Sequence, residues 1–185
     1  AQRVGPVSWV QSERFQGWLR AMNSAKYSVF VGVNAIAAGR RSRTRDAIGA
    51  VRHVFLDVDD DGSRVLSCVD ARGDLPPLSY VLHTSPNHVH LFWRVIGFDH
   101  DSVERLQKQL ASELGSDPAA TPVTQNTRLP GFFNHKREQP HLVAVEYLNV
   151  EARYTPADFP PLNLAPAVPR QVGPHVLRGS NQLVI

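Results

Sequence analysis

The chain has 185 residues, of which 42% are hydrophobic, so it is long enough for one domain with a buried core and too short for two large ones. Its single cysteine, Cys68, excludes an intramolecular disulfide and a cysteine-rich zinc site, and favours a reducing, cytoplasmic location. The net charge of +3 permits a polyanionic partner without requiring one. No signal peptide and no apolar run of roughly 20 residues is present, so we expect no membrane insertion.

Two helices and five strands are predicted from the spacing of apolar residues. Behind Ser12, apolar residues recur at helical spacing as far as Met22, which predicts an amphipathic helix. A second helix is expected over 101–114, where valine and leucine form one stripe and Asp99 or Asp101 can cap the start. Short runs of apolar and β-branched residues predict strands over 27–36, 52–59, 79–84, 88–95 and 141–148.

This succession of strands and helices, with some strands joined by hairpins, is typical of an α+β domain, which we expect to cover residues 1–154. Prolines recur after Tyr154 and interrupt any helix or central strand, so residues 155–185 are expected to form a Pro-rich linker or tail. The first residue is not Met and the chain stops abruptly at Ile185, so we expect the tail to lead to a further C-terminal region.

Asp57 and Asp59 form the first candidate functional pair. In an extended strand they point to the same face, about 6.6 Å apart at Cα, while Leu56 and Val58 point to the core. Two like charges at this distance repel unless a cation neutralises them, and Mg²⁺ or Mn²⁺ with oxygen ligands is the usual solution. Two such ions bridged by carboxylates can activate a hydroxyl and stabilise a leaving pyrophosphate.

Other interpretations of this stretch remain open. The carboxylates can simply end a solvated strand, and Asp60-Asp61-Gly62 is typical of a turn. A calcium-binding loop would need a bidentate Glu at its twelfth position, where Cys68 stands, and a helix before the loop, where a strand is predicted.

A second candidate group begins at a turn that contains Ser85. Alternation in the strand that follows places His88 and His90 on one face and the intervening apolar residues on the core face. A histidine with one anchored ring nitrogen can donate to a phosphate oxygen from the other, so both are candidate nucleotide-binding residues. Two polar residues on a solvated sheet face are the simpler alternative.

Asp117, Arg128, Asn134 and Lys136 form a third group. A third carboxylate is what a site with two metal ions still needs, although Asp117 follows a helix and can be a turn residue. Arg128 and Lys136 can supply fixed positive charge for a triphosphate or a template phosphate. The Pro-Gly dipeptide between them forces a turn that can bring both to one side.

A cluster of arginines precedes the aspartate strand, in a stretch that also holds Gly39 and Ser42. Such a loop can follow a nucleic-acid backbone, whereas a solvated surface loop is the alternative. The arginines are Arg40, Arg41, Arg43 and Arg45.

The order of these motifs resembles the RepB-type branch of the archaeo-eukaryotic primases, the DNA primases and primase-polymerases of plasmids and other mobile elements. The resemblance covers roughly residues 29–146. It consists of the Asp-x-Asp strand, a histidine strand after a Ser-containing turn, an aspartate, and then Arg-Leu-Pro-Gly and Asn-His-Lys. It implies an RRM-like antiparallel catalytic sheet with flanking helices and a smaller N-terminal α/β part.

The resemblance also implies roles for individual residues. It assigns metal binding to Asp57, Asp59 and Asp117, and a catalytic histidine to His90. It implies primer synthesis from NTPs or dNTPs on single-stranded DNA with two Mg²⁺ or Mn²⁺ ions, and a replicative helicase, fused or separate, as a candidate partner. His88 stands where many relatives have a small hydroxyl residue, and the zinc module of cellular primases is absent. The expected nucleotide-binding residues are Ser85, His88, His90, Arg128, Asn134 and Lys136.

Two other functions stay open at this point. His88-Val89-His90 is also the His-hydrophobic-His signature of relaxases and rolling-circle nucleases. Those enzymes need a tyrosine nucleophile, whereas the four tyrosines of this chain lie in strand-like runs or beside a proline. The other function is a catalytically inert single-strand binding module. The three acids and the histidine argue against it.

Overall fold

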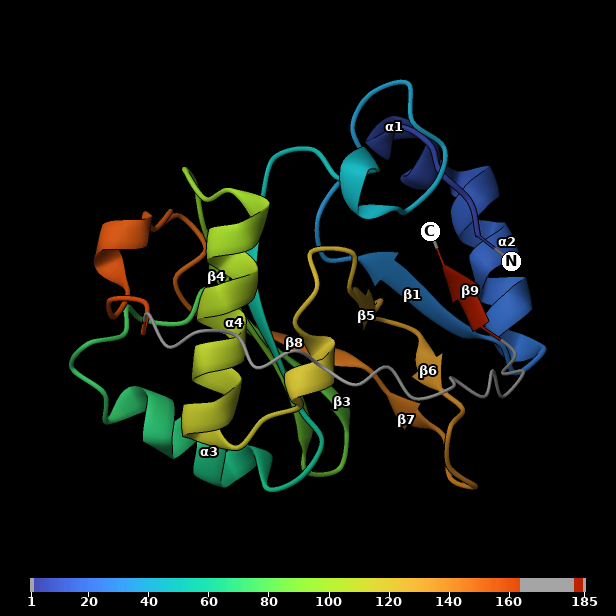
Figure 1. Ribbon diagram of the computed structural model, residues 1–185. Coiled ribbons are helices and arrows are strands. Elements are labelled where there is room, and N and C mark those ends of the chain that lie inside the picture. Colours follow the sequence, from blue (N-terminus) through green and yellow to red (C-terminus); the bar gives the residue numbers. More distant parts are fainter. Residues whose placement is uncertain (1, 164–181, 185) are drawn as a thin grey trace, which may run out of the picture.

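A four-stranded antiparallel sheet forms the centre of the computed structural model, which describes residues 2–163 and 182–184 (Figure 1). Helix α3 (Gly62–Asp70) follows its first strand and helix α4 (His100–Leu114) its third, so the chain order of this part is β-α-β-β-α-β. The prediction of an α+β domain with an RRM-like sheet and flanking helices is confirmed. In order across the sheet, the strands are β2 (His53–Val58), β4 (His88–Arg94), β3 (Tyr80–Ser85) and β8 (Ala144–Tyr147).

A smaller sheet lies beside the central one (Figure 1). Its middle strand, β1 (Ser28–Gly32), pairs antiparallel with β5 (Asn126–Arg128) and parallel with β9 (Gln182–Val184). Helices α1 (Val7–Val10) and α2 (Glu13–Ser24) precede β1. This is the predicted N-terminal α/β part, except that β5 and β9 come from later in the chain.

Short elements connect the two sheets. A two-stranded ribbon consists of β6 (Phe133–Asn134) and β7 (His141–Leu142), so the single strand expected over 141–148 is in fact β7 and β8. Three 3₁₀ helices complete the described secondary structure: η1 (Arg45–Ala47), η2 (Pro118–Ala120) and η3 (Pro156–Asp158).

The two faces of the central sheet pack against different parts of the chain. Helices α3 and α4 cover one face, where β2 buries Val54, Leu56 and Val58 among apolar residues of both helices (Figure 1). The opposite face packs Phe55 and Phe92 against Val33, Ala120 and Val143. Because side chains alternate along a strand, the residues that follow Phe55 on this second face reach the gap between the two sheets.

Helix α3 is missing from the sequence-based prediction, which took Asp60-Asp61-Gly62 as a turn. Asp61 has a left-handed conformation (φ 54°) and precedes the first turn of α3. The N–H of Gly62 donates to the carbonyl of Asn87 in the β3–β4 hairpin (3.0 Å). A Cβ at position 62 would lie 3.0 Å from that oxygen and 3.1 Å from Val89, so glycine permits this close approach.

The packed structure continues beyond residue 154, where the sequence led us to expect a tail. Tyr154 pairs with Val95 in a parallel bridge, and the η3 turn that follows brings Phe159 into the main core, where it is 6% exposed and contacts the ring of Trp93. Much of the remaining expected tail lies outside the described residues. Within the described part of the chain, no helix is long and apolar enough to cross a membrane.

Candidate active site

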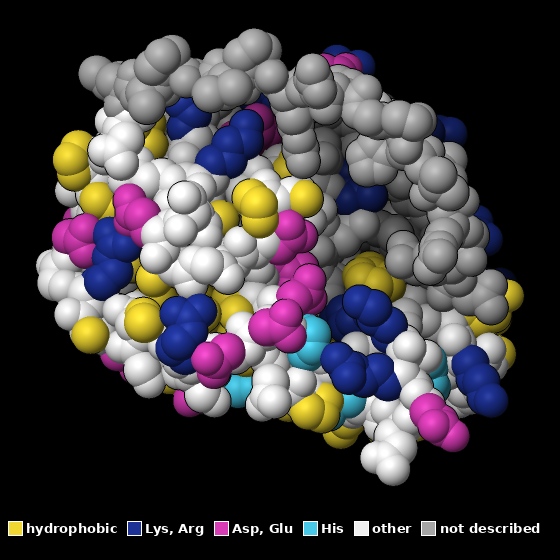
Figure 2. Space-filling model, turned by 60° about the horizontal axis from the view of Figure 1, so that its bottom comes forward, with side chains coloured by type: hydrophobic (Ala, Val, Ile, Leu, Met, Phe, Trp, Pro, Cys, Tyr) yellow, Lys and Arg dark blue, Asp and Glu magenta, His cyan; other side chains and the backbone are white. Residues whose placement is uncertain are grey.

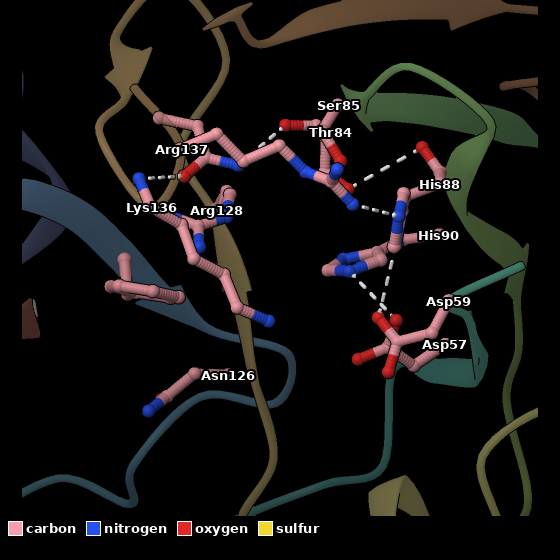
Figure 3. Close-up of a pocket in the computed structure, with 12 residues that line it drawn as sticks. Asp57, Asp59, Thr84, Ser85, His88, His90, Asn126, Arg128, Lys136 and Arg137 are labelled. Carbon is pink, nitrogen blue, oxygen red and sulfur yellow. Dashed lines mark hydrogen bonds and ion pairs between the residues drawn. The ribbon is translucent and has the colours of Figure 1, made fainter. Parts of the chain in front are cut away.

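The candidate site is a polar pocket between the two sheets, with a cavity volume of about 170 Å³. The ends of β2, β3 and β4 form one wall, and β1, β5 and the β6 segment form the other (Figure 3). Figure 2 shows acidic, histidine and basic side chains next to one another on one face of the molecule. The residues singled out from the sequence that line the pocket are Asp57, Asp59, Ser85, His88, His90, Arg128, Asn134 and Lys136.

The two aspartates come from the end of one strand. Asp57 is the penultimate residue of β2 and is half-buried, whereas Asp59 follows the strand and is exposed. Between them, Val58 is fully buried on the helix-covered face. The alternation of β2 therefore brings both carboxylates into the same pocket.

Asp57 is an ionised carboxylate whose Oδ1 faces His90. Burial raises the pKa of Asp57, but contact with His90 and the charge of Lys136 act in the opposite direction, so its pKa lies below the usual value. Oδ1 is buried and has no aligned hydrogen-bond donor among the described residues, although Nε2 of His90 lies 3.1 Å away.

His90 is fixed at both ring nitrogens. Nδ1 lies 2.7 Å from the hydroxyl oxygen of Thr127 in β5, and Nε2 faces Asp57, its cross-strand partner in β2. The edge of the ring packs on Phe55 at an interplanar angle of 89°. Thr127 is therefore the anchor of this ring, and Nε2 is the nitrogen that faces the pocket.

His88 lies between Asp59 and Arg137 and contacts both. Nε2 of His88 lies 2.9 Å from a guanidinium nitrogen of Arg137, which can only donate, so this ring nitrogen accepts. The proton of a neutral ring then sits on Nδ1, which donates to Oδ1 of Asp59 (3.2 Å). His88 thus orients a carboxylate on one side and an arginine on the other.

Arg128 is held against an aromatic ring on the opposite wall. Its guanidinium carbon lies 4.7 Å from the ring centroid of Phe30, its partner in the β1–β5 pairing. Desolvation lowers the pKa of Arg128, and the charges of Asp57 and Asp59 offset part of this effect. Nη1 is buried and has no hydrogen-bond partner among the described residues. The side chain therefore presents an oriented positive charge with an unused donor.

Asn134 has a local structural role. Its amide nitrogen donates to the carbonyl of Thr84 at the end of β3 (2.8 Å), and its side-chain oxygen accepts from the backbone N–H of Lys136 (3.0 Å). Asn134 thus joins the two walls and places Lys136, whose exposed side chain lines the pocket. Ser85 is buried at the pocket wall beside Thr84.

Asp117 lies beside the pocket but is not part of its lining. Its backbone N–H donates to the carbonyl of Asp57 (2.9 Å), which places the two residues next to each other. Its carboxylate, however, caps η2 by accepting from the N–H of Ala119 (2.8 Å). Among the described residues, no group of three His, Cys, Asp or Glu side chains is arranged to hold a metal ion. The expected set of three carboxylates is thus not assembled in this structure.

Two of the four arginines in the cluster before β2 have structural contacts. Arg45 begins η1 and forms ion pairs with Asp101 (2.5 Å) and Glu104 (3.4 Å) of α4. Arg43 is half-buried and donates to the carbonyl of Thr124. Only Arg40 and Arg41 of the four have exposed side chains without an ion pair to a described carboxylate. The structural contacts of Arg43 and Arg45 were not predicted from the sequence.

Several pocket residues were missed in the sequence. Arg137 stands in an exposed charged stretch next to Lys136, and that proximity was the only available signal. No individual motif marks Phe30 and Asn126 in the pocket, or the buried Thr127 behind His90, because they meet the central sheet only through the pairing of β1 with β5.

A known protein family matches most of the chain. Residues 1–159 match the model of the RepB DNA-primase N-terminal domain family. No curated protein matches the chain in sequence.

Three solved structures have a similar fold. The primase-polymerase domain of cyanophage S-2L is 22% identical with a TM-score of 0.52, over 62% of this chain and 61% of that one. The primase RepB′ is 23% identical with a TM-score of 0.53, over 75% of this chain and 44% of that one. The catalytic domain of RepB′ in complex with initiator DNA is 24% identical with a TM-score of 0.53, over 74% and 64%.

The chain thus spans between 44% and 64% of the length of these solved chains, and the similarity to them concerns the fold. The family match covers far more than half of the sequence and agrees with the order of the motifs. The chain belongs to the RepB DNA-primase N-terminal domain family, which confirms the resemblance carried by the order of its motifs.

Proposed function

We propose that this domain synthesises short primers on single-stranded DNA by nucleotidyl transfer from NTPs or dNTPs. The observation that carries the proposal is the composition of the pocket: Asp57 and Asp59 stand on one wall, and Arg128 and Lys136 on the other. Phosphoryl transfer from a nucleotide requires carboxylates that can hold divalent cations. It also requires positively charged side chains, on the other side of the pocket, that can hold a triphosphate.

The aspartates fit Mg²⁺ or Mn²⁺ by their chemistry. Both ions prefer oxygen ligands, and the buried Oδ1 of ionised Asp57 lacks an aligned donor among the described residues. Asp57 and Asp59 would hold the ions, and Asp117 could join them if its carboxylate released the N–H of Ala119. Two bound ions would favour deprotonation of the primer 3′-hydroxyl and neutralise charge on the leaving pyrophosphate.

The cationic residues would bind and orient the nucleotide. Arg128 and Lys136 would hold phosphate oxygens, and Arg137 extends this charge at the rim of the pocket. His90 can donate from Nε2 to a phosphate oxygen because Thr127 keeps the ring in place at Nδ1. His88 would hold Asp59 and Arg137 in position, and Asn134 would place Lys136.

The nuclease alternative is not favoured by the site. His88 and His90 each contact an aspartate, and no tyrosine lines the described pocket to act as a nucleophile.

Primer synthesis can be tested directly with the purified domain, single-stranded DNA, labelled NTPs or dNTPs, and Mg²⁺ or Mn²⁺. We expect short products that disappear with EDTA, and at least about 100-fold less product from Asp57→Asn and from Asp59→Asn. Asp60→Asn is the matched control, because Asp60 adjoins the site without lining it. Both Asn variants should remain folded, since the change removes charge from a polar face and opens no core cavity. Normal synthesis by either variant would contradict the proposal.

A further inference from the structure

A second polar pocket lies at the opposite end of β2 and β4 from the aspartates. Its cavity volume is about 420 Å³, and it is lined by Arg52, His53, Arg94, Val95 and Arg153. We call it the arginine pocket. His53 and Asp57 lie on the same side of β2, four residues apart, which corresponds to about 13 Å along the strand.

Backbone pairing brings the three arginines together from distant parts of the sequence. His53, next to Arg52, pairs with Arg94 in the β2–β4 ladder, and the N–H of Val95 donates to the carbonyl of Arg52 (2.9 Å). The N–H of Tyr154 donates to the carbonyl of Arg94 (2.8 Å), which places Arg153 beside this strand end. The convergence is therefore a property of the fold and not of three independent flexible side chains.

The positive charge of the arginine pocket is not neutralised by the protein. None of the three arginines forms an ion pair with a carboxylate in the described part of the chain. His53 adds no charge: desolvation lowers its pKa, and the nearby Arg94 and Arg52 lower it further against the effect of the Val33 carbonyl.

Most of the donors in this pocket remain available. His53 uses both ring nitrogens, since Nδ1 lies 2.8 Å from the carbonyl oxygen of Val33 and Nε2 lies 2.9 Å from the hydroxyl of Tyr80. Arg94 donates to the carbonyl of Val150 and is thereby positioned. A guanidinium has five N–H donors in a planar fork that matches phosphate oxygens, so the three arginines can hold an anion with several bonds.

An exposed aromatic ring lies on the opposite edge strand of the same sheet. Tyr147 is 70% exposed on β8 and is the cross-strand partner of Tyr80, whose hydroxyl contacts His53. A basic pocket with an accessible aromatic ring is typical of proteins that bind single strands, in which bases are free to stack. A stacked strand advances about 3.4 Å per nucleotide, so the distance to Asp57 corresponds to about four nucleotides.

We propose that the arginine pocket binds a backbone phosphate of the single-stranded DNA on which the domain acts, and that Tyr147 stacks on a neighbouring base. This inference rests on the proposed function in one respect only, namely that the bound nucleic acid is single-stranded DNA.

The test measures DNA binding without catalysis. A fluorescent oligo-dT is titrated with the domain in EDTA over a range of salt concentrations, using the double variant Arg52→Gln/Arg153→Gln; Arg94 is kept because it contacts Val150. Each lost phosphate contact should reduce the slope of log affinity against log salt by about 0.7, hence about 1.4 for the pair, and weaken binding roughly 25-fold at 0.1 M salt. Tyr147→Leu should weaken binding and leave the slope unchanged, because a stacking contact releases no counterions.

The matched control is Arg105→Gln/Lys108→Gln, which removes the same charge from exposed positions of α4, on the opposite face of the sheet. It should change the slope far less than the arginine-pocket variant. A second readout is the KM for dNTP at saturating template, which should not change in the arginine-pocket variant. Unchanged DNA affinity and slope would overturn the inference, and so would a raised KM with normal DNA binding, which would assign the pocket to a free triphosphate. A wild-type domain that binds DNA through these arginines but makes no primers would refute the proposed function and leave this inference standing.

Discussion

Nε2 of His90 lies 3.1 Å from Oδ1 of Asp57, the residue directly opposite it in the β2–β4 ladder. The other nitrogen of the same ring contacts Thr127, which belongs to the neighbouring sheet. One imidazole therefore connects the carboxylate wall of the pocket to the wall that carries Arg128.

This arrangement predicts that His90→Ala raises the KM for nucleotide at least about tenfold and changes DNA affinity little, because the lost ring lines the pocket that we propose for the triphosphate. Initial rates at varied dNTP and saturating template give the KM, and anisotropy with oligo-dT gives the affinity.

Thr127→Val tests the anchor separately, since it leaves Nε2 in place but removes the partner of Nδ1. It should raise KM by a smaller factor, and Thr127→Ser should restore the wild-type value. An unchanged KM in His90→Ala would place the triphosphate elsewhere, and a covalent tyrosyl-DNA product would instead support the nuclease class.

We predict that Arg128 is required for primer synthesis but does not stabilise the folded domain. Its guanidinium is desolvated, packs on Phe30 and has an unused Nη1, so the folded domain holds a charge that it does not fully compensate. Arg128→Met should reduce synthesis by at least about 100-fold while the midpoint of thermal unfolding stays the same or rises. Arg128→Lys should not restore full activity, because an ammonium lacks the planar fork. A large loss of thermal stability in Arg128→Met would show that the arginine is mainly structural.

The arginine cluster before β2 should divide into two classes of effect. Arg40→Ala/Arg41→Ala should flatten the salt dependence of DNA binding by up to about 0.7 per residue, if this loop contacts phosphates. Arg43→Ala should lower thermal stability instead, because Arg43 donates to the carbonyl of Thr124. Incorporation opposite saturating template should survive in both variants. Salt titrations and thermal melts of the same preparations separate the two classes, and an unchanged slope in the Arg40/Arg41 variant would make that part of the loop an ordinary solvated surface.

The sequence predicted those parts of the site that depend on local periodicity. Alternation alone places Asp57 and Asp59, and likewise His88 and His90, on the face opposite the core, and the structure has both pairs in one pocket. The sequence could not show that Thr127 contacts His90, because that contact depends on the pairing of β5 with β1, which lies far away in the chain.

Two further features depend on side-chain conformation. The pattern marks Asp117 as an acid at the expected spacing, but its carboxylate has a competing local partner, the N–H of Ala119. Arg137 is an exposed cation among other charged residues, and only its contact with His88 distinguishes it.

The limit of the folded unit gives the last prediction. Proline-rich sequence after Tyr154 is typical of a linker, yet Phe159 is 6% exposed and packs on Trp93, Phe98 and Tyr154. Apolar contact can hold a segment that lacks regular secondary structure, so the boundary is set by this side chain and not by the prolines.

Phe159→Ala should lower the free energy of unfolding by about 3 kcal/mol, as expected for a buried phenylalanine, without altering the KM for nucleotide. Pro160→Ala is the control, because it changes the adjacent position and keeps the aromatic ring. A domain that ends at residue 154 should show a similar loss in urea unfolding relative to one that ends at residue 163, because both lack β9 and only the longer one keeps Phe159. If the domain that ends at 154 were as stable as the one that ends at 163, Phe159 would be a passive surface contact and the linker would begin where the prolines do.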